Sequence, residues 1–149
     1  MTVLRAMMLG MLAIAALILP SASEAQDGPY KVAFHIDDND VGKMSLTLNN
    51  VQNIINDFKK TGRKIEIEIV GNGPGLHMFR ADTSPVKARI AEMALANPDI
   101  VFSACGNTQS NMAKAEKKSI TLISETKPVA SGVVHLVELQ RKGYAYIKP

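Results

Sequence analysis

The chain contains a single cysteine in 149 residues, no tryptophan and only 5% aromatic residues. One cysteine cannot form an internal disulfide bond, so core packing must hold the fold together. The net charge is only +3, and the lysines and arginines are scattered along the chain. Nucleic-acid binding needs a concentrated basic face, so no nucleic-acid partner is expected. These shortages leave the thiol of Cys105 as the most distinctive chemical group.

The first 25 residues have the pattern of an export signal. Arg5 is followed by an apolar run over residues 6–19, which ends at Pro20. The run is too short to span a bilayer comfortably, and Ser23-Glu24-Ala25 offers small residues where a signal peptidase reads. We expect cleavage after Ala25 and a periplasmic or secreted protein of residues 26–149, with no stable membrane insertion. An uncleaved anchor helix is the alternative.

Segments typical of strands and helices alternate along the rest of the chain. Strands are predicted at residues 31–36, 65–70, 100–104, 127–130 (or 120–123) and 144–147. Helices are predicted between Asp40 and Gly62, from Ser84-Pro85 to residue 97, and at residues 107–118 and 131–141. The alternation predicts a single α/β domain with three α/β/α layers and a mostly parallel five-stranded sheet. We expect the flavodoxin-like strand order 2-1-3-4-5. Glutamates alternate with isoleucines in residues 65–70, which favours an edge position for that strand.

Cys105 follows a buried strand and precedes Gly106-Asn107-Thr108, the turn that opens the third helix. A thiol at such a junction lies near free backbone N–H groups and the positive end of a helix dipole, and both favour the thiolate. In the expected order, strands one and three are neighbours, so the ligand-binding switch point would fall between residues 35–40 and Cys105. The alternative is a small, buried, inert cysteine.

Two segments resemble signatures of one family. Phe102-Ser103-Ala104-Cys105-Gly106-Asn107-Thr108 is similar to the cysteine motif of the DsrE/DsrF-like family. The tail resembles its carboxyl-terminal signature at Ser131-Gly132-Val133-Val134, Leu139-Gln140 and Gly143-Tyr144-Ala145-Tyr146-Ile147. The likeness covers residues 30–149. It implies a DsrE-like α/β fold, homo- or hetero-oligomers, and a sulfur relay in which Cys105 carries persulfide sulfur between donor and acceptor proteins. The well-understood relays of the family are cytoplasmic, so an exported member would use other partners.

Other polar residues are candidates for a binding role. His35 ends the first strand and His77 follows a glycine-rich loop, and either could move a proton or pair with a thiolate. Hydrogen-bonded structural imidazoles are the alternative. The loop at residues 71–75 offers an anion nest or, as its alternative, a tight turn. The candidate binding residues are His35, Asn72, Gly73, His77, Gly106, Asn107 and Thr108.

No cofactor or metal site is expected. The acidic loop at residues 37–40 fails the calcium-loop pattern at Val41, and its charge would repel a flavin phosphate. The leading hypothesis is an exported DsrE-like carrier of sulfane sulfur, with sulfurtransferase-like transfer through Cys105. Whether such transfer makes it an enzyme stays open.

Two other functions remain. One is a non-catalytic periplasmic oligomeric binding module, and the other is a Cu(I) binder using His77 and Met78 with Cys105 and Met112. The helix at residues 131–141 is apolar on more than one face. This pattern predicts a homo-oligomer contact or, alternatively, a deeply buried helix.

Overall fold

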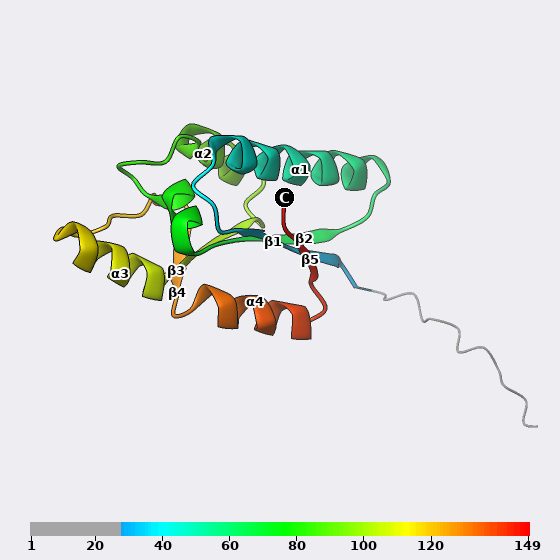
Figure 1. Ribbon diagram of the computed structural model, residues 1–149. Coiled ribbons are helices and arrows are strands. Elements are labelled where there is room, and N and C mark those ends of the chain that lie inside the picture. The colour runs from blue at the N-terminus through cyan, green and yellow to red at the C-terminus, as the bar shows by residue number, and fades with distance from the viewer. Residues whose placement is uncertain (1–27) are drawn as a thin grey trace, which may run out of the picture.

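The computed structural model describes residues 28–149, and the predicted signal peptide with its cleavage site lies outside this range (Figure 1). The elements follow one another as β1 (Tyr30–Ile36), α1 (Val41–Lys60), β2 (Ile65–Gly71), the 3₁₀ helix η1 (Gly73–Phe79), α2 (Lys87–Ala96), β3 (Val101–Cys105), α3 (Gly106–Glu116), β4 (Thr126–Val129), α4 (Gly132–Arg141) and β5 (Ala145–Ile147).

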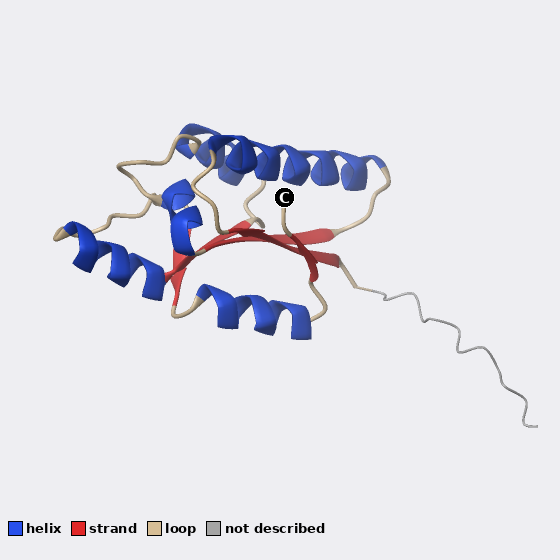
Figure 2. Cartoon of the chain, in the orientation of Figure 1, coloured by secondary structure: helices blue, strands red, loops and turns tan. Residues whose placement is uncertain are grey.

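The sheet is sandwiched between helices. Its five strands have the order β4-β3-β2-β1-β5, and every pairing is parallel. Helices α1 and α2 cover one face and α4 covers the other, while α3 lies beside the β3–β4 end (Figures 1 and 2). The predicted three-layer α/β fold with a parallel five-stranded sheet is therefore confirmed.

The predicted strand order is wrong. β2 lies between β1 and β3, and β5 occupies the other side of β1, with Phe34 opposite Ile147. The chain steps from β1 to β4 in one direction and then crosses back under the sheet through α4. The reversal of strand order thus falls between β1 and β5, and the switch point predicted at Cys105 is not there.

The predicted edge position of the second strand is also wrong. β2 pairs on both sides, and Glu68 in its middle is only 7% exposed. Its carboxyl group accepts hydrogen bonds from Ser103 Oγ and His135 Nε2, both at 2.5 Å. The alternation of glutamate and isoleucine reflects a polar network beneath α4 rather than solvent, and both arrangements produce the same period of two.

The long helix α1 follows the sequence closely. Asp40 caps it by accepting a hydrogen bond from Lys43 N at 2.8 Å, and it ends before Gly62, which has a positive φ of 67°. Glycine adopts this conformation without steric cost. The apolar stripe is buried in the main core, on Met44, Leu48, Val51 and Ile55.

The glycine-rich loop runs directly into η1 and packs tightly against β1. A Cβ added at Gly75 would lie 2.2 Å from the carbonyl oxygen of Ile36, so only glycine fits. The next helix starts at Lys87 rather than at the predicted Ser84-Pro85. Ser84 is buried and its hydroxyl donates to Met78 O at 2.6 Å, which ties this segment to η1 instead of capping a helix.

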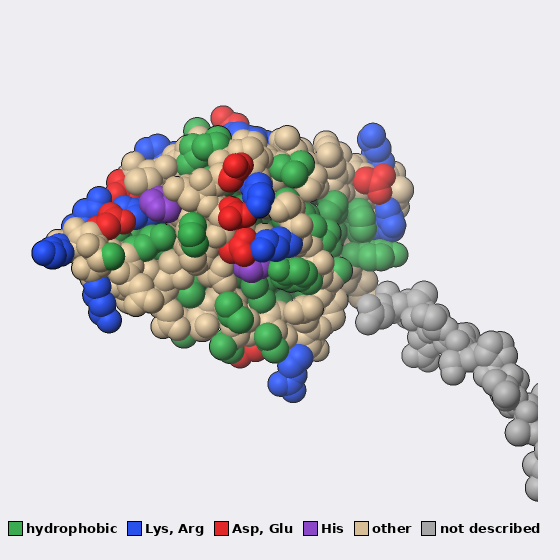
Figure 3. All heavy atoms as spheres, in the orientation of Figure 1, with side chains coloured by type: hydrophobic (Ala, Val, Ile, Leu, Met, Phe, Trp, Pro, Cys, Tyr) green, Lys and Arg blue, Asp and Glu red, His purple; other side chains and the backbone are tan. Residues whose placement is uncertain are grey.

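Helix α4 buries one side and leaves another exposed. Leu136 and Leu139 pack in a small second core with Ala33 and Val70. Three valines on the outer side are more than half exposed: Val133, Val134 and Val137. Figure 3 shows apolar side chains gathered along the lower edge, where α4 lies. Within residues 28–149, no helix combines the length and apolar character needed to cross a membrane.

Candidate functional site

Cys105 is the last residue of β3 and the N-cap of α3. Its side chain lies against α4, since a Cβ placed on Gly132 would be 3.1 Å from the Cys105 Cβ. The residue is 5% exposed, yet polar groups border it as well as carbon. Thr108 N donates to Sγ at 3.5 Å, the usual N-cap contact to the third helical residue.

The amino-terminal ends of α3 and α4 converge on this sulfur. The N–H of Gly132, the first amide of α4, lowers the pKa of the thiol, and the helix N-cap Ser131 makes no side-chain capping hydrogen bond. The N–H of Asn107 donates to Ala130 O at 3.2 Å and also lowers the pKa of the thiol. Burial raises the pKa of the Cys105 thiol, but the Thr108 side chain and the three amides lower it, and the net pKa is below its ordinary value.

A hydrogen bond from the glycine-rich loop orients the Thr108 hydroxyl. Gly73 N donates to Thr108 Oγ1 at 3.0 Å. Because that oxygen is occupied as an acceptor, its own proton is available to donate toward the sulfur. The glycine loop therefore acts on the thiol through one threonine.

His35 connects the ends of three strands. Its Nε2 lies 3.0 Å from Asn72 Oδ1, and its Nδ1 lies 2.7 Å from the hydroxyl of Tyr146 on β5. A carboxamide oxygen only accepts, so Nε2 carries the proton and Nδ1 accepts from the tyrosine. Asn72, just after β2, also lies against Gly132, which borders Cys105.

The predicted binding residues lie around Cys105, with the exception of His77. His35, Asn72, Gly73 and Thr108 join in contacts that lead to Cys105, together with the backbone of Gly106 and Asn107.

His77 belongs elsewhere. Its Nδ1 lies 2.8 Å from Thr83 Oγ1, and it lines a shallow groove of about 410 Å³ between η1 and α3. Gly73, Thr108 and Met112 share that groove, but Cys105 is not part of its lining.

Sequence reasoning missed the network of Glu68, Ser103 and His135 under α4. Ser103 is 1% exposed and lies two residues before Cys105, so both side chains point to the α4 face of the sheet. His135 lies one turn beyond Gly132 and is joined to Glu68. The network holds α4 close to the thiol. A glutamate amid strand-forming residues was the only signal available in the sequence.

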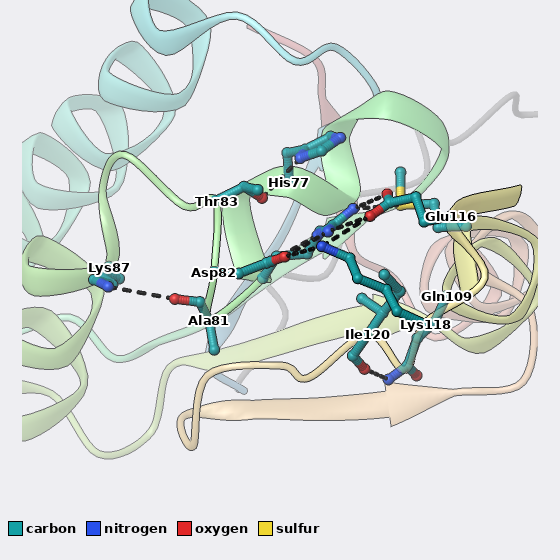
Figure 4. A network of polar contacts seen from close by, with 11 residues as sticks. His77, Ala81, Asp82, Thr83, Lys87, Gln109, Glu116, Lys118 and Ile120 are labelled. Carbon is teal, nitrogen blue, oxygen red and sulfur yellow. Dashed lines mark hydrogen bonds and ion pairs between the residues drawn. The ribbon is translucent and has the colours of Figure 1, made fainter.

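A second missed network joins η1 to α3. Arg80 is 1% exposed, and its guanidinium binds the carboxylates of Asp82 and Glu116. In Figure 4, Asp82, Glu116 and Lys118 converge at this point. The hydrogen bond from Arg80 is the main cause that lowers the pKa of Glu116 to about 2. This network fixes the outer end of the helix that begins at the thiol.

The proposed soft-metal ligands are not gathered. Met78 is completely buried in the main core, while Met112 Sδ lies 3.8 Å from the Arg80 guanidinium. Among residues 28–149, no three His, Cys, Asp or Glu side chains lie together in a way that could hold a metal ion.

Comparison with known proteins finds similarity to solved structures but not to a described family. No protein-family profile and no curated protein matches it. It is similar to MTH1491, a protein of unknown function from Methanobacterium thermoautotrophicum, with 33% sequence identity and a TM-score of 0.67. The match covers 80% of this chain and 99% of that one. The chain therefore belongs to the same family as MTH1491.

Proposed function

We propose that this protein is an exported, DsrE-like carrier of sulfane sulfur that accepts and releases one sulfur atom at Cys105. The observation that carries the proposal is the convergence of two helix amino termini on Sγ, which lowers the pKa of a nearly buried thiol. Structural cysteines in cores have the opposite tendency, because burial alone raises the pKa. With one cysteine in the chain, no second thiol can expel the bound sulfur as an internal disulfide.

The transfer step needs no oxidant or reductant. The Cys105 thiolate attacks the outer sulfur of a donor persulfide R–S–SH. A bond forms between Sγ and that sulfur, and the donor S–S bond breaks. The donor leaves as the thiolate R–S⁻, and Cys105 becomes Cys–S–SH, which then loses its proton to become Cys–S–S⁻. An acceptor thiolate reverses the same chemistry.

Mass spectrometry tests this function. After incubation of the protein with glutathione persulfide, we expect a mass gain of one sulfur on the wild type and none on Cys105→Ser. A wild type without the adduct, or an equal adduct on Cys105→Ser, contradicts the proposal. The donor and acceptor proteins would be partners in the exported compartment.

The second candidate is a non-catalytic oligomeric binding module, for which the exposed valines of α4 are the favouring observation. Val133, Val134 and Val137 are 59%, 56% and 52% exposed and form an apolar face that another copy could cover. In that case the thiol of the native protein would be inert to alkylation, while Val134→Asp would shift the oligomer toward monomer in sedimentation. A fast-reacting thiol favours the carrier.

A further inference from the structure

Only one end of the Asn72 carboxamide has a hydrogen-bond partner. The residue is 9% exposed, and its Oδ1 accepts from His35 Nε2 at 3.0 Å. Among residues 28–149, its amide NH₂ group has no acceptor. Nδ2 is not among the fully buried atoms that lack a partner, so it reaches the surface of the protein and can donate to a ligand that enters from solvent.

The free amide and the Cys105 side chain both border Gly132. Its Nδ2 is 3.6 Å, and its Cβ 3.1 Å, from the position that a Cβ on Gly132 would take, which in turn is 3.1 Å from the Cys105 Cβ. The groups that lower the pKa of the thiol belong to Thr108, Gly132 and Asn107, not to Asn72. The amide is therefore near Cys105 but is not among the groups that lower the pKa of its Sγ.

We infer that the Asn72 amide donates a hydrogen bond to the outer sulfur of the Cys105 persulfide. This inference rests on the sulfur-carrier function proposed above, and it names the residue that receives the transferred atom. Negative charge in Cys–S–S⁻ lies on the outer sulfur, one bond beyond the reach of the donors to Sγ. A fixed donor at that position stabilises the charge as it develops during transfer.

His35 and Tyr146 are positioning residues for this amide. Tyr146 O–H donates to His35 Nδ1, which leaves Nε2–H to hold Asn72 Oδ1 and so directs the NH₂ group away from the histidine. Without that contact the carboxamide can turn over and present its oxygen, which repels a persulfide anion.

The test compares two reactions of the same thiol. One is the rate of sulfur uptake from glutathione persulfide, and the other is alkylation by iodoacetamide across pH, which reports the pKa of Cys105. For Asn72→Ala we expect sulfur uptake to fall about 10- to 100-fold, the effect of losing a hydrogen bond to a charged group. The thiol pKa should not change. Asn72→Asp should fall further, because it places an acceptor where the donor was.

Two further variants complete the experiment. Asn49→Ala is the matched control, since Asn49 is exposed on α1, across the sheet from α4. It should keep wild-type uptake. Tyr146→Phe removes only a hydroxyl from a residue that is 42% exposed, so it should fold normally. Its sulfur uptake should fall about 2- to 10-fold with the alkylation profile unchanged.

The results separate the two proposals. If the wild type takes up no sulfur, the carrier function fails. If the wild type takes up sulfur and the folded Asn72→Ala and Tyr146→Phe variants match its rate, the role of Asn72 is refuted and the carrier function stands. The role is also refuted if the thiol pKa rises in Asn72→Ala by enough to explain the slower uptake. The amide would then donate to Sγ and not to the outer sulfur.

Discussion

Removing the carboxyl group of Glu68 should destabilise the protein far more than its surface-like sequence pattern suggests. In Glu68→Ala, the Ser103 hydroxyl loses its acceptor at a site that is 1% exposed, at a cost of about 1–3 kcal/mol. His135 also loses its partner, but its side chain is 21% exposed and can turn to water. With the lost packing of the glutamate stem, we expect about 2–4 kcal/mol in total.

Thermal and urea unfolding measure this effect. At about 4 °C for each kcal/mol in a domain of this size, the melting temperature should fall by about 8–16 °C. Glu68→Gln keeps an acceptor oxygen for both partners and should cost about 1 kcal/mol. Glu92→Ala, an exposed glutamate on α2, serves as the control and should stay within about 0.5 kcal/mol of the wild type.

A double-mutant cycle tests the cause. Since Ser103 needs the carboxyl group as its acceptor, Glu68→Ala should cost about 1–2 kcal/mol less in a Ser103→Ala background. Additive losses, or a Glu68→Ala protein as stable as the control, would refute the network as the anchor of α4.

Three further predictions follow from single contacts. Thr108→Val keeps the side-chain shape but removes the hydroxyl that lowers the thiol pKa, so the pKa of Cys105 should rise and alkylation at pH 7 should slow; an unchanged pH profile would refute the contact. The pKa of Glu116 is lowered from 4.5 to about 2, mainly by Arg80, so its contribution to stability is complete above pH 4.5 and is lost as the pH falls toward 2. Glu116→Gln should therefore flatten the fall in melting temperature over that interval, and an equally steep fall would exclude this carboxylate as its source. Gly75→Ala puts a methyl group 2.2 Å from a β1 carbonyl and should cost about 3 kcal/mol in urea unfolding, whereas Gly28→Ala, with open space around it, should cost nothing.

Local structure was predictable where one residue type decides it. Asp40 begins α1 and Gly62 follows its end because capping and positive φ depend on neighbours in the chain. The predicted start of the second helix was wrong for the converse reason, since Ser84 has a tertiary partner in η1 that its local sequence does not reveal. Periodicity predicted which segments are helices and which are strands. The ends of these elements differ from the prediction where tertiary contacts compete with local preferences.

The strand order was not predictable from the pattern of elements. Alternating strands and helices fit several parallel orders, and the choice depends on whether β3 or the three-residue β5 pairs with β1. The position of Glu68 was predicted wrongly for the same reason, because a period of two fits both a solvent-exposed edge strand and a polar layer beneath a helix. The neighbourhood of Cys105 was nevertheless predicted in part, since parallel strands end at one edge of the sheet in any order.

Substitution of Gly132 should change the reactivity of the Cys105 thiol with little effect on the stability of the fold. Its backbone needs no positive φ, so alanine is compatible with the helix and favours it by about 1 kcal/mol in propensity. Yet the new methyl group would lie 3.1 Å from the Cβ atoms of Cys105 and Asn72, which forces the first turn of α4 back by a few tenths of an ångström.

The amide of residue 132 then moves away from the sulfur whose pKa it lowers. We expect Gly132→Ala to change unfolding free energy by less than about 1 kcal/mol while it raises the pKa of Cys105 and slows both alkylation at pH 7 and sulfur uptake. Val133→Ala, one residue further on the exposed side of α4, is the control and should leave the thiol unchanged. A Gly132→Ala protein with a wild-type thiol pKa would mean that α4 does not activate this sulfur, and that α3 alone sets its reactivity.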